Sequence, residues 1–287
     1  MNRVPVNSLI NGIVADYINI NDRSIHYGDG LFETILCNHN NLYYWQQHFQ
    51  RLQTSAKQLK IACPPEKVFL DDITKLLTDN DSRSACAIKI IVSRGTGERG
   101  YKFSKNTSAN RLVMLSSLDA GHSSVLSRKL LQGELFICRQ QVSINENLAG
   151  LKHLNRLENV MARNEWDAGY IDGLMLNANQ HVIEGSMSNL FAIRGSQLFT
   201  PDLKLSGVNG IMREMIIGLA AKNDIKTTVT NLTIDEISTM DELFISNSLL
   251  GMKAVTKLGD SLYKAQQVSD MIFSELLKTI DDYAQAV

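Results

Sequence analysis

The sequence predicts an α+β protein with two domains, and three observations support this prediction. The chain has 287 residues, which is longer than the commonest single domain. Segments with strand and helix patterns alternate irregularly and include several hairpins, which argues against a doubly wound parallel sheet. The segment Ser117–Ser124 is polar, rich in small residues and flanked by strand-like runs, as is typical of a linker. We therefore expect one domain over residues 1–116 and a second over residues 125–287.

The first domain is predicted to contain a β-hairpin followed by two helices and two more strands. The apolar runs Gly30–Leu36 and Leu42–Trp45 favour strands, and His39–Asn41 between them has turn chemistry. Apolar residues at helical spacing and the pair Pro64–Pro65 indicate the helices. The remaining expected elements are helices over about 45–60 and 66–77 and strands over Ala85–Val92 and Arg111–Ser116.

The second domain is predicted to mix helices with short strands that turns connect. Leu154, Leu157 and Met161 form an apolar stripe, which predicts a helix over about 153–167. The other expected elements are strands over Gly173–Asn177, Gln180–Glu184, Met187–Arg194 and Glu242–Ser246 and helices over 209–222 and 265–283.

Charge and hydropathy patterning favour a small-molecule partner. Lys and Arg total 29 against 30 Asp and Glu, for a formal net charge of -1, so we expect neither nucleic-acid nor membrane binding. Residues Met1–Ser8 lack the apolar core of a signal peptide, and no apolar run approaches the ~20 residues that span a bilayer. We expect a cytoplasmic protein. Four widely spaced cysteines and six scattered histidines predict no metal site.

Two segments contain the residues that best explain a chemical function. Lys152 follows Gly150 and Leu151, which add little bulk, and it precedes the predicted apolar helix. An isolated lysine is usually a solvated surface charge, but desolvation in a cleft would make its amine nucleophilic. Glu184 ends a predicted strand, where a glutamate is usually exposed. A lysine that can form a Schiff base and a carboxylate that can pair with a protonated ring nitrogen are what pyridoxal phosphate requires.

The segments Gly150–Val160 and Glu184–Phe191 together resemble the fold-type IV family of pyridoxal-phosphate enzymes, and the resemblance covers most of the chain. It implies a two-domain, D-amino-acid-aminotransferase-like α+β fold, with a small N-terminal α/β domain and a larger C-terminal domain of barrel-like β structure. It also implies pyridoxal 5'-phosphate as the cofactor and a homodimer. Lys152 is then the Schiff-base lysine, and Glu184, in the family pattern E-G-x-x-x-N, is the partner of the ring nitrogen.

The resemblance also implies a set of phosphate-binding residues. Arg51 occupies the arginine position of the family's H-x-x-R-L pattern and suits bidentate phosphate binding, although it could instead be a surface arginine beside an apolar helix face. The glycine-rich run that precedes Ile211 opens a helix, whose N-terminal amides can bind anions. Met212 stands where related aminotransferases usually have threonine, so only the backbone amides of Ile211 and Met212 could contribute. Asn247 and Ser248 are further candidate donors.

The loop Ser93–Tyr101 is rich in glycine but matches neither GxGxxG nor GxxxxGK[ST]. It is either a flexible surface loop or a carboxylate clamp that uses Arg99 and Tyr101, as the resemblance implies. Phe32 stands where a D-amino-acid aminotransferase is expected to have a tyrosine. Thr34 would face the cofactor by strand alternation with Phe32, which makes it a candidate to assist proton transfer.

The Arg-Gly-Tyr sequence of this loop is similar to that of the lyases of the family. The expected activity is therefore conversion of 4-amino-4-deoxychorismate to 4-aminobenzoate and pyruvate in folate biosynthesis. A D-amino-acid or branched-chain aminotransferase is the alternative. A non-catalytic pyridoxal-phosphate-binding protein is a third possibility, which the presence of Lys152, Glu184 and Arg51 disfavours.

Overall fold

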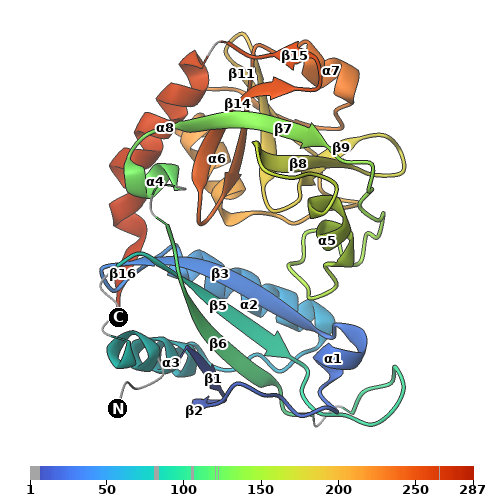
Figure 1. Cartoon of the computed structure of the whole chain (residues 1–287), viewed down its shortest axis with the longest axis vertical. Helices are drawn as coiled ribbons and strands as arrows, with labels where there is room; N and C mark the ends of the chain where they lie inside the picture. The colour runs from blue at the N-terminus through green and yellow to red at the C-terminus, as the bar shows by residue number, and fades with distance from the viewer. Residues whose placement is uncertain (1–6, 81–83, 105–106, 120, 122, 265) are drawn as a thin grey trace. The chain divides into compact units, whose positions relative to one another are not determined.

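The computed structural model of the protein describes residues 7–80, 84–104, 107–119, 121, 123–264 and 266–287, and it contains two compact units (Figure 1). Unit 1 comprises Met1–Asp119, Lys152–Asn155 and Asp282–Val287, and unit 2 comprises Ala120–Leu151 and Arg156–Asp281. The segment that contains Lys152 therefore belongs to unit 1, although the residues on both sides of it belong to unit 2. The domain boundaries drawn from composition, with a linker over 117–124, stay a prediction.

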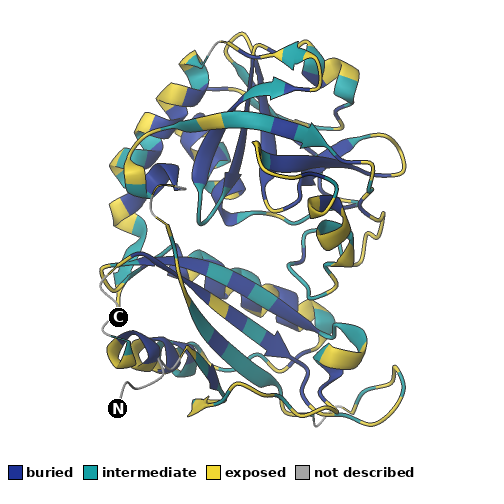
Figure 2. Cartoon of the chain, in the orientation of Figure 1, coloured by how far each residue is buried: buried dark blue, intermediate teal, exposed yellow. Residues whose placement is uncertain are grey.

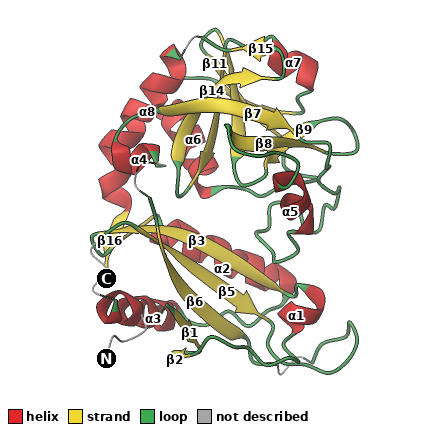
Figure 3. Cartoon of the chain, in the orientation of Figure 1, coloured by secondary structure: helices red, strands yellow, loops and turns green. Residues whose placement is uncertain are grey.

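Unit 1 is built on a seven-stranded sheet whose paired strands are all antiparallel (Figure 3). The strand order is β16-β4-β3-β5-β6-β1-β2. The strands are β1 (Ser8–Ile10), β2 (Ile13–Val14), β3 (Gly30–Asn38), β4 (Asn41–Tyr43), β5 (Cys86–Ser93), β6 (Asn110–Ser117) and β16 (Ala284–Ala286). The predicted hairpin is confirmed as β3 and β4, and its turn residues His39 and Asn40 both have positive φ, at 50° and 60°.

Three helices accompany this sheet: α1 (Arg23–Tyr27), α2 (Trp45–Leu59) and α3 (Glu66–Asp79). The apolar stripes of α2 and α3 pack on one face of the sheet and form a core that includes Leu31, Ile35 and Ile88. Because side chains alternate along a strand, Phe32 and Thr34 of β3 lie on the opposite face from this core. The helices predicted over 45–60 and 66–77 and the strands predicted over 85–92 and 111–116 are confirmed.

Unit 2 contains a nine-stranded mixed sheet in the order β12-β11-β10-β13-β14-β7-β8-β9, with β15 paired to β14. An isolated bridge from Val182 to Leu232 connects β9 to the segment after β12, so the sheet curls back on itself. The α+β fold with barrel-like β structure is thus confirmed. The strands are β7 (Leu131–Ile137), β8 (Tyr170–Leu176), β9 (Val182–Gly185), β10 (Asn189–Arg194), β11 (Gln197–Pro201), β12 (Thr227–Thr230), β13 (Glu242–Asn247), β14 (Gly251–Leu258) and β15 (Ser261–Leu262).

Strands β8, β10 and β13 are buried over most of their length (Figure 2). Leu174, Leu190 and Ile245 from these strands belong to one apolar core. The helices of unit 2 are α4 (Ser124–Ser127), α5 (Leu157–Arg163), α6 (Ile211–Lys222), α7 (Ile234–Ser238) and α8 (Gln267–Thr279), and a 3₁₀ turn, Ile280–Tyr283, follows α8.

One predicted helix is wrong over much of its length. The helix expected over 153–167 is present only as α5, because Lys152–Leu154 are extended and form backbone hydrogen bonds with β3. The strand expected over 187–194 begins only at Asn189. The helix expected over 265–283 is confirmed from Gln267, whereas Ala265 lies outside the described residues. Ala120 and His122 of the expected linker also lie outside them.

Among the residues that the structure describes, no helix combines the length and apolarity needed to cross a bilayer. Over the same residues, no three His, Cys, Asp or Glu side chains cluster as metal ligands would. Cys37, Cys63, Cys86 and Cys138 form no disulfide bond with one another.

Candidate active site

Lys152 lies on a short extended segment that pairs with the start of β3 in unit 1. The backbone N–H of Phe32 donates to the carbonyl of Lys152 at 3.0 Å, and the N–H of Leu154 donates to the carbonyl of Gly30 at 3.0 Å. A Cβ at Gly30 would lie 2.7 Å from the backbone oxygen of Val92 and 2.7 Å from Leu154 Cδ1, so glycine at this position permits the close packing. Lys152 Nζ lies 4.3 Å from the centroid of the Phe32 ring. The segment thus holds the predicted reacting amine over Phe32.

A second lysine, Lys89, lies beside the same ring, and sequence reasoning missed it. Lys89 is exposed on β5 directly opposite Thr34, and its Nζ is 5.4 Å from the Phe32 centroid. Phe32, Thr34, Lys89 and Lys152 therefore share the sheet face opposite the core. A single charge inside the apolar run Ala87–Val92 was the signal that could have identified Lys89.

Arg51 is held by Glu33, which lies on the core side of β3. Arg51 donates through Nε and Nη2 to the two carboxylate oxygens, at 2.8 and 2.5 Å, and His48 Nδ1 lies 2.7 Å from Glu33 Oε2. Burial raises the pKa of Glu33, but the charge of Arg51 and the hydrogen bonds from His48 and Arg51 outweigh burial and lower that pKa to about 2. The carboxylate is therefore ionised and fixes the guanidinium.

Burial lowers the pKa of His48 and outweighs the hydrogen bond and the charge of Glu33, which raise that pKa; the charges of Arg51 and Lys152 act in the same direction as burial. A proton on Nδ1 lets the imidazole donate to the ionised Glu33. His48 Nε2 is buried and accepts no hydrogen bond from the described residues.

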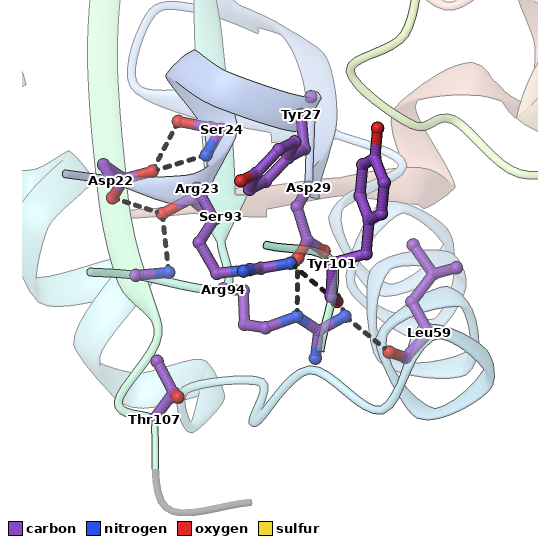
Figure 4. Close-up of polar contacts among 12 residues, drawn as sticks. Asp22, Arg23, Ser24, Tyr27, Asp29, Leu59, Ser93, Arg94, Tyr101 and Thr107 are labelled. Atoms are coloured by element: carbon purple, nitrogen blue, oxygen red, sulfur yellow. Dashed lines mark hydrogen bonds and ion pairs between the residues drawn. The ribbon is translucent and has the colours of Figure 1, made fainter. Parts of the chain in front are cut away.

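The loop that contains Arg99 and Tyr101 is anchored through its backbone, and Figure 4 shows Tyr101 of this loop near Arg23 and Tyr27. Arg23 donates through Nη1 to the carbonyl of Gly100 at 2.9 Å and through Nη2 to the carbonyl of Tyr101 at 3.1 Å. The N–H of Gly100 donates to Tyr27 Oη at 3.1 Å, and the rings of Tyr27 and Tyr101 lie 5.4 Å apart. The side chain of Arg99 is exposed, and Tyr101 is 85% exposed. Both side chains are therefore accessible on a loop whose backbone is anchored.

The root of this loop contains a network of buried charges. Asp29 accepts hydrogen bonds from Arg23 and Arg94 at 2.8 Å each, and Arg94 also donates to the carbonyl of Leu59 at 2.8 Å (Figure 4). Burial raises the pKa of Asp29, but these two arginines outweigh burial and hold the pKa below its usual range. Charged hydrogen bonds among Arg23, Asp29 and Arg94 thus stabilise the base of this loop.

In unit 2, Glu184 and Asn189 hold the same backbone unit from its two sides. Glu184 Oε2 accepts the N–H of Val208 at 2.8 Å, and Asn189 Nδ2 donates to the carbonyl of Val208 at 2.9 Å. A Cβ at Gly210 would lie 1.9 Å from Asn189 Oδ1, so only glycine fits there. The carboxylate predicted to pair with a ring nitrogen is therefore coupled to the turn that leads into α6.

Gly210 is the N-cap of α6, whose first residues are Ile211 and Met212. Both side chains are buried, and phosphate binding by their backbone amides stays a prediction. The amides at such a helix start attract an anion.

Asn247 and Ser248 form the turn between β13 and β14. Asn247 Oδ1 accepts the N–H groups of Leu249 and Leu250 at 3.0 and 2.7 Å, and its Nδ2 donates to the carbonyl of Met187 at 3.0 Å. The side chain of Asn247 thus stabilises the turn, while Ser248 is half-buried beside it.

Sequence reasoning also missed Arg156, the first residue of unit 2 after the Lys152 segment. Burial lowers the pKa of Arg156, and the negative charge of Glu184 opposes that shift more than any other charge does. The sequence around Arg156 gave no distinctive signal for it, because one arginine before a helix is commonly a surface charge.

Comparison with known proteins shows which protein family the chain matches. The family model described as amino-transferase class IV matches residues 30–258. A Vibrio harveyi protein named aminodeoxychorismate lyase is 34% identical over 248 residues, which cover 86% of this chain and 89% of that protein.

Two further proteins illustrate the range of similar enzymes. The crystal structure of 4-amino-4-deoxychorismate lyase from Pseudomonas aeruginosa has a TM-score of 0.85 at 31% identity and covers 96% of this chain and 99% of its own. A D-alanine aminotransferase from Listeria monocytogenes is 24% identical over 242 residues, which cover 84% of this chain and 82% of that protein.

Proposed function

Because the chain belongs to the class IV aminotransferase family, whose enzymes depend on pyridoxal phosphate, we propose that it is a lyase that converts 4-amino-4-deoxychorismate to 4-aminobenzoate and pyruvate. The observation that supports this activity best is the pair of ammonium groups, Lys152 Nζ and Lys89 Nζ, beside the ring of Phe32. A substrate with two carboxylates that reacts at Lys152 would find a second cation on the same sheet face. The similarity to two enzymes named as this lyase supports the same conclusion.

The residues present fit the cofactor. A cofactor with a phosphate, a ring nitrogen and an aldehyde needs a cation with helix amides, a carboxylate and a lysine. Unit 1 would supply Lys152 and the cation Arg51, and unit 2 would supply the carboxylate of Glu184 and the amides of Ile211 and Met212. A Cβ at Gly207 would lie 2.7 Å from Ile183 Cγ2 and 3.3 Å from Glu184 Cδ, so glycine at this position lets the backbone pack closely against Glu184. When bound, pyridoxal phosphate supplies a ring that accepts an electron pair from the substrate carbon.

In the reaction, Lys152 Nζ takes the proton from the ring carbon of the substrate that bears the amino group. The bond between the substrate ring and the enolpyruvyl oxygen then breaks, and the ring becomes aromatic. Lys152 returns a proton to the released enolpyruvate, which becomes pyruvate. Thr34, on the same sheet face, is placed to hydrogen-bond during these transfers, and Arg99, Tyr101 and Lys89 bind the substrate carboxylates. The gain of aromaticity favours elimination, so no keto acid is consumed.

The alternative is a D-amino-acid or branched-chain aminotransferase. The 24% identity to a D-alanine aminotransferase supports it, whereas Phe32 lacks the hydroxyl that such an enzyme would use. Purified protein with bound cofactor is assayed in parallel for 4-aminobenzoate release without a keto acid and for transamination of D-alanine or leucine with 2-oxoglutarate. We expect release to be the faster reaction. Transamination that far outpaces release would establish the alternative.

The proposal includes a homodimer in the cytoplasm. Leu157, Val160 and Met161 form an apolar stripe on α5 that is 71%, 54% and 53% exposed in the single chain, and a second copy could cover it. Four cysteines without a disulfide bond suit a reducing compartment. Sedimentation equilibrium that gives the mass of one chain would contradict the dimer.

A further inference from the structure

We propose that Asp172, buried in β8, is a positioning residue that holds the loop between Glu184 and Asn189 and thereby sets the place of both side chains. The inference rests on the proposed function, since it concerns the residues that would hold the cofactor. Neither the sequence pattern nor the similarity of the chain to known enzymes indicates a role for Asp172.

Asp172 has no exposed surface and accepts hydrogen bonds from three successive loop residues. Its Oδ1 accepts the N–H of Ser186 at 3.1 Å and the hydroxyl of Ser186 at 2.6 Å. Its Oδ2 accepts the N–H of Met187 at 3.3 Å and the hydroxyl of Ser188 at 2.6 Å. A fifth donor is the N–H of Gly173, at 2.7 Å from Oδ1. Four of the five donors therefore come from the loop.

The loop is packed directly against this carboxylate. A Cβ at Gly185 would lie 2.4 Å from both Asp172 Oδ2 and Ser188 Oγ, so a larger residue cannot occupy this position without moving the loop or Asp172. The N–H of Gly185 donates to the carbonyl of Ser188 at 2.7 Å, which closes a tight turn. Contact with Asp172 thus explains why glycine occupies position 185 and serine occupies positions 186 and 188, between Glu184 and Asn189.

Both ends of the loop lead into the candidate site. Glu184 and Asn189 hold Val208 from its two sides, and the carbonyl of Met187 accepts a hydrogen bond from Asn247. A shift of the loop would therefore move Glu184, the turn into α6 and the turn that contains Ser248 together. Displacement of a binding group by about 1 Å can cost on the order of 100-fold in rate.

Loop and carboxylate depend on each other. Burial raises the pKa of Asp172, and the hydrogen bonds from Ser186 and Ser188 oppose that shift most strongly. Lys253 is the nearby cation: burial lowers its pKa, and the charge of Asp172 opposes the shift. Without the loop donors the carboxylate would be buried with few partners, which is costly. The native loop conformation is therefore strongly preferred.

The test compares Asp172→Asn with a matched control, Glu242→Gln. Glu242 is also a buried carboxylate of unit 2, and it accepts the N–H of Val268 and both the N–H and the hydroxyl of Ser269, away from the loop. The readouts are the dissociation constant for pyridoxal phosphate and the pH at which the visible absorption of the holoenzyme changes. Asp172→Asn should weaken cofactor binding by about tenfold or more, as the loss of supporting hydrogen bonds to ligating groups does elsewhere, and should shift the absorption change. Glu242→Gln should do neither.

Two further measurements complete the test. Ser186→Ala and Ser188→Ala each remove one donor and keep the carboxylate, so they should produce smaller changes of the same kind even if Asp172→Asn does not fold. The effects of Asp172→Asn and Glu184→Gln on the pH of the absorption change should be strongly non-additive, because Asp172 would act on that pH by positioning the Glu184 carboxylate. Additive effects would overturn the inference. So would serine variants whose cofactor affinity and absorption change equal those of Glu242→Gln. In either case, cofactor binding by the wild type would still support the proposed function. Failure of the wild type to bind the cofactor would overturn both.

Discussion

At the scale of single residues, the Glu33 carboxylate should make stability depend on pH. Its pKa in the folded protein is about 2, below the ordinary 4.5. Because the folded-state pKa is the lower one, the stabilisation is fully present above pH 4.5 and is lost as the pH falls toward 2, and it amounts to about 3 kcal/mol. In urea denaturation, the free energy of unfolding of the wild type should therefore exceed that of Glu33→Gln by a large amount at pH 7 and by a smaller amount at pH 3.5.

The exposed ion pair between Lys67 and Asp71 provides a control. Asp71→Asn should change the free energy of unfolding little at either pH, since exposed pairs contribute little. If the free energies of unfolding of the wild type and Glu33→Gln differ by the same amount at pH 7 and at pH 3.5, Glu33 is not held ionised by Arg51 and His48.

Substitutions of Glu184 and of Arg51 are expected to have different effects on cofactor binding and on rate. Glu184→Gln should retain the cofactor and lose most of the rate, because a neutral amide cannot keep a ring nitrogen protonated. Arg51→Ala should weaken cofactor binding by about 2–5 kcal/mol, as when one partner of a buried charge pair is removed. Titration of each variant with pyridoxal phosphate measures its cofactor affinity. If Glu184→Gln binds the cofactor more weakly than Arg51→Ala does, the two roles are wrongly assigned.

At the scale of an element, the loop after β5 should bind substrate only while its backbone is anchored. Arg23→Gln removes the donors to the carbonyls of Gly100 and Tyr101. It should raise KM for aminodeoxychorismate by about tenfold, which corresponds to the loss of about 1.4 kcal/mol of binding, and should change kcat less. Arg99→Ala should show the same pattern.

Arg111 provides the matched control in unit 1, because it pairs with Asp72 at 2.7 Å in the same kind of arginine–aspartate contact. Arg111→Gln should leave KM unchanged. If Arg23→Gln instead lowers kcat at constant KM, or if Arg111→Gln raises KM equally, the loop does not act as a clamp.

At the scale of the whole molecule, local patterns predicted most elements, whereas the candidate residues were identified from the resemblance to a family. Local patterns could predict α2 and α3 because apolar spacing along a helix is a local property. They could not predict that residues 152–154 pair with β3, since the partners are more than a hundred residues apart and an apolar stripe there favours a helix. Lys89 and Asp172 were missed for the same reason: each is explained by contacts with residues distant in sequence.

The central claim is that Lys152 is the residue that carries the cofactor, and the structure provides a specific rival, since Lys89 Nζ lies beside the same aromatic ring. The most direct measurement is borohydride reduction of the purified holoenzyme, which fixes the cofactor to its lysine, followed by peptide mapping. We predict that the pyridoxyl label lies on Lys152 alone and that Lys152→Ala loses both the label and 4-aminobenzoate release. A label on Lys89, or on any other lysine, would contradict the account.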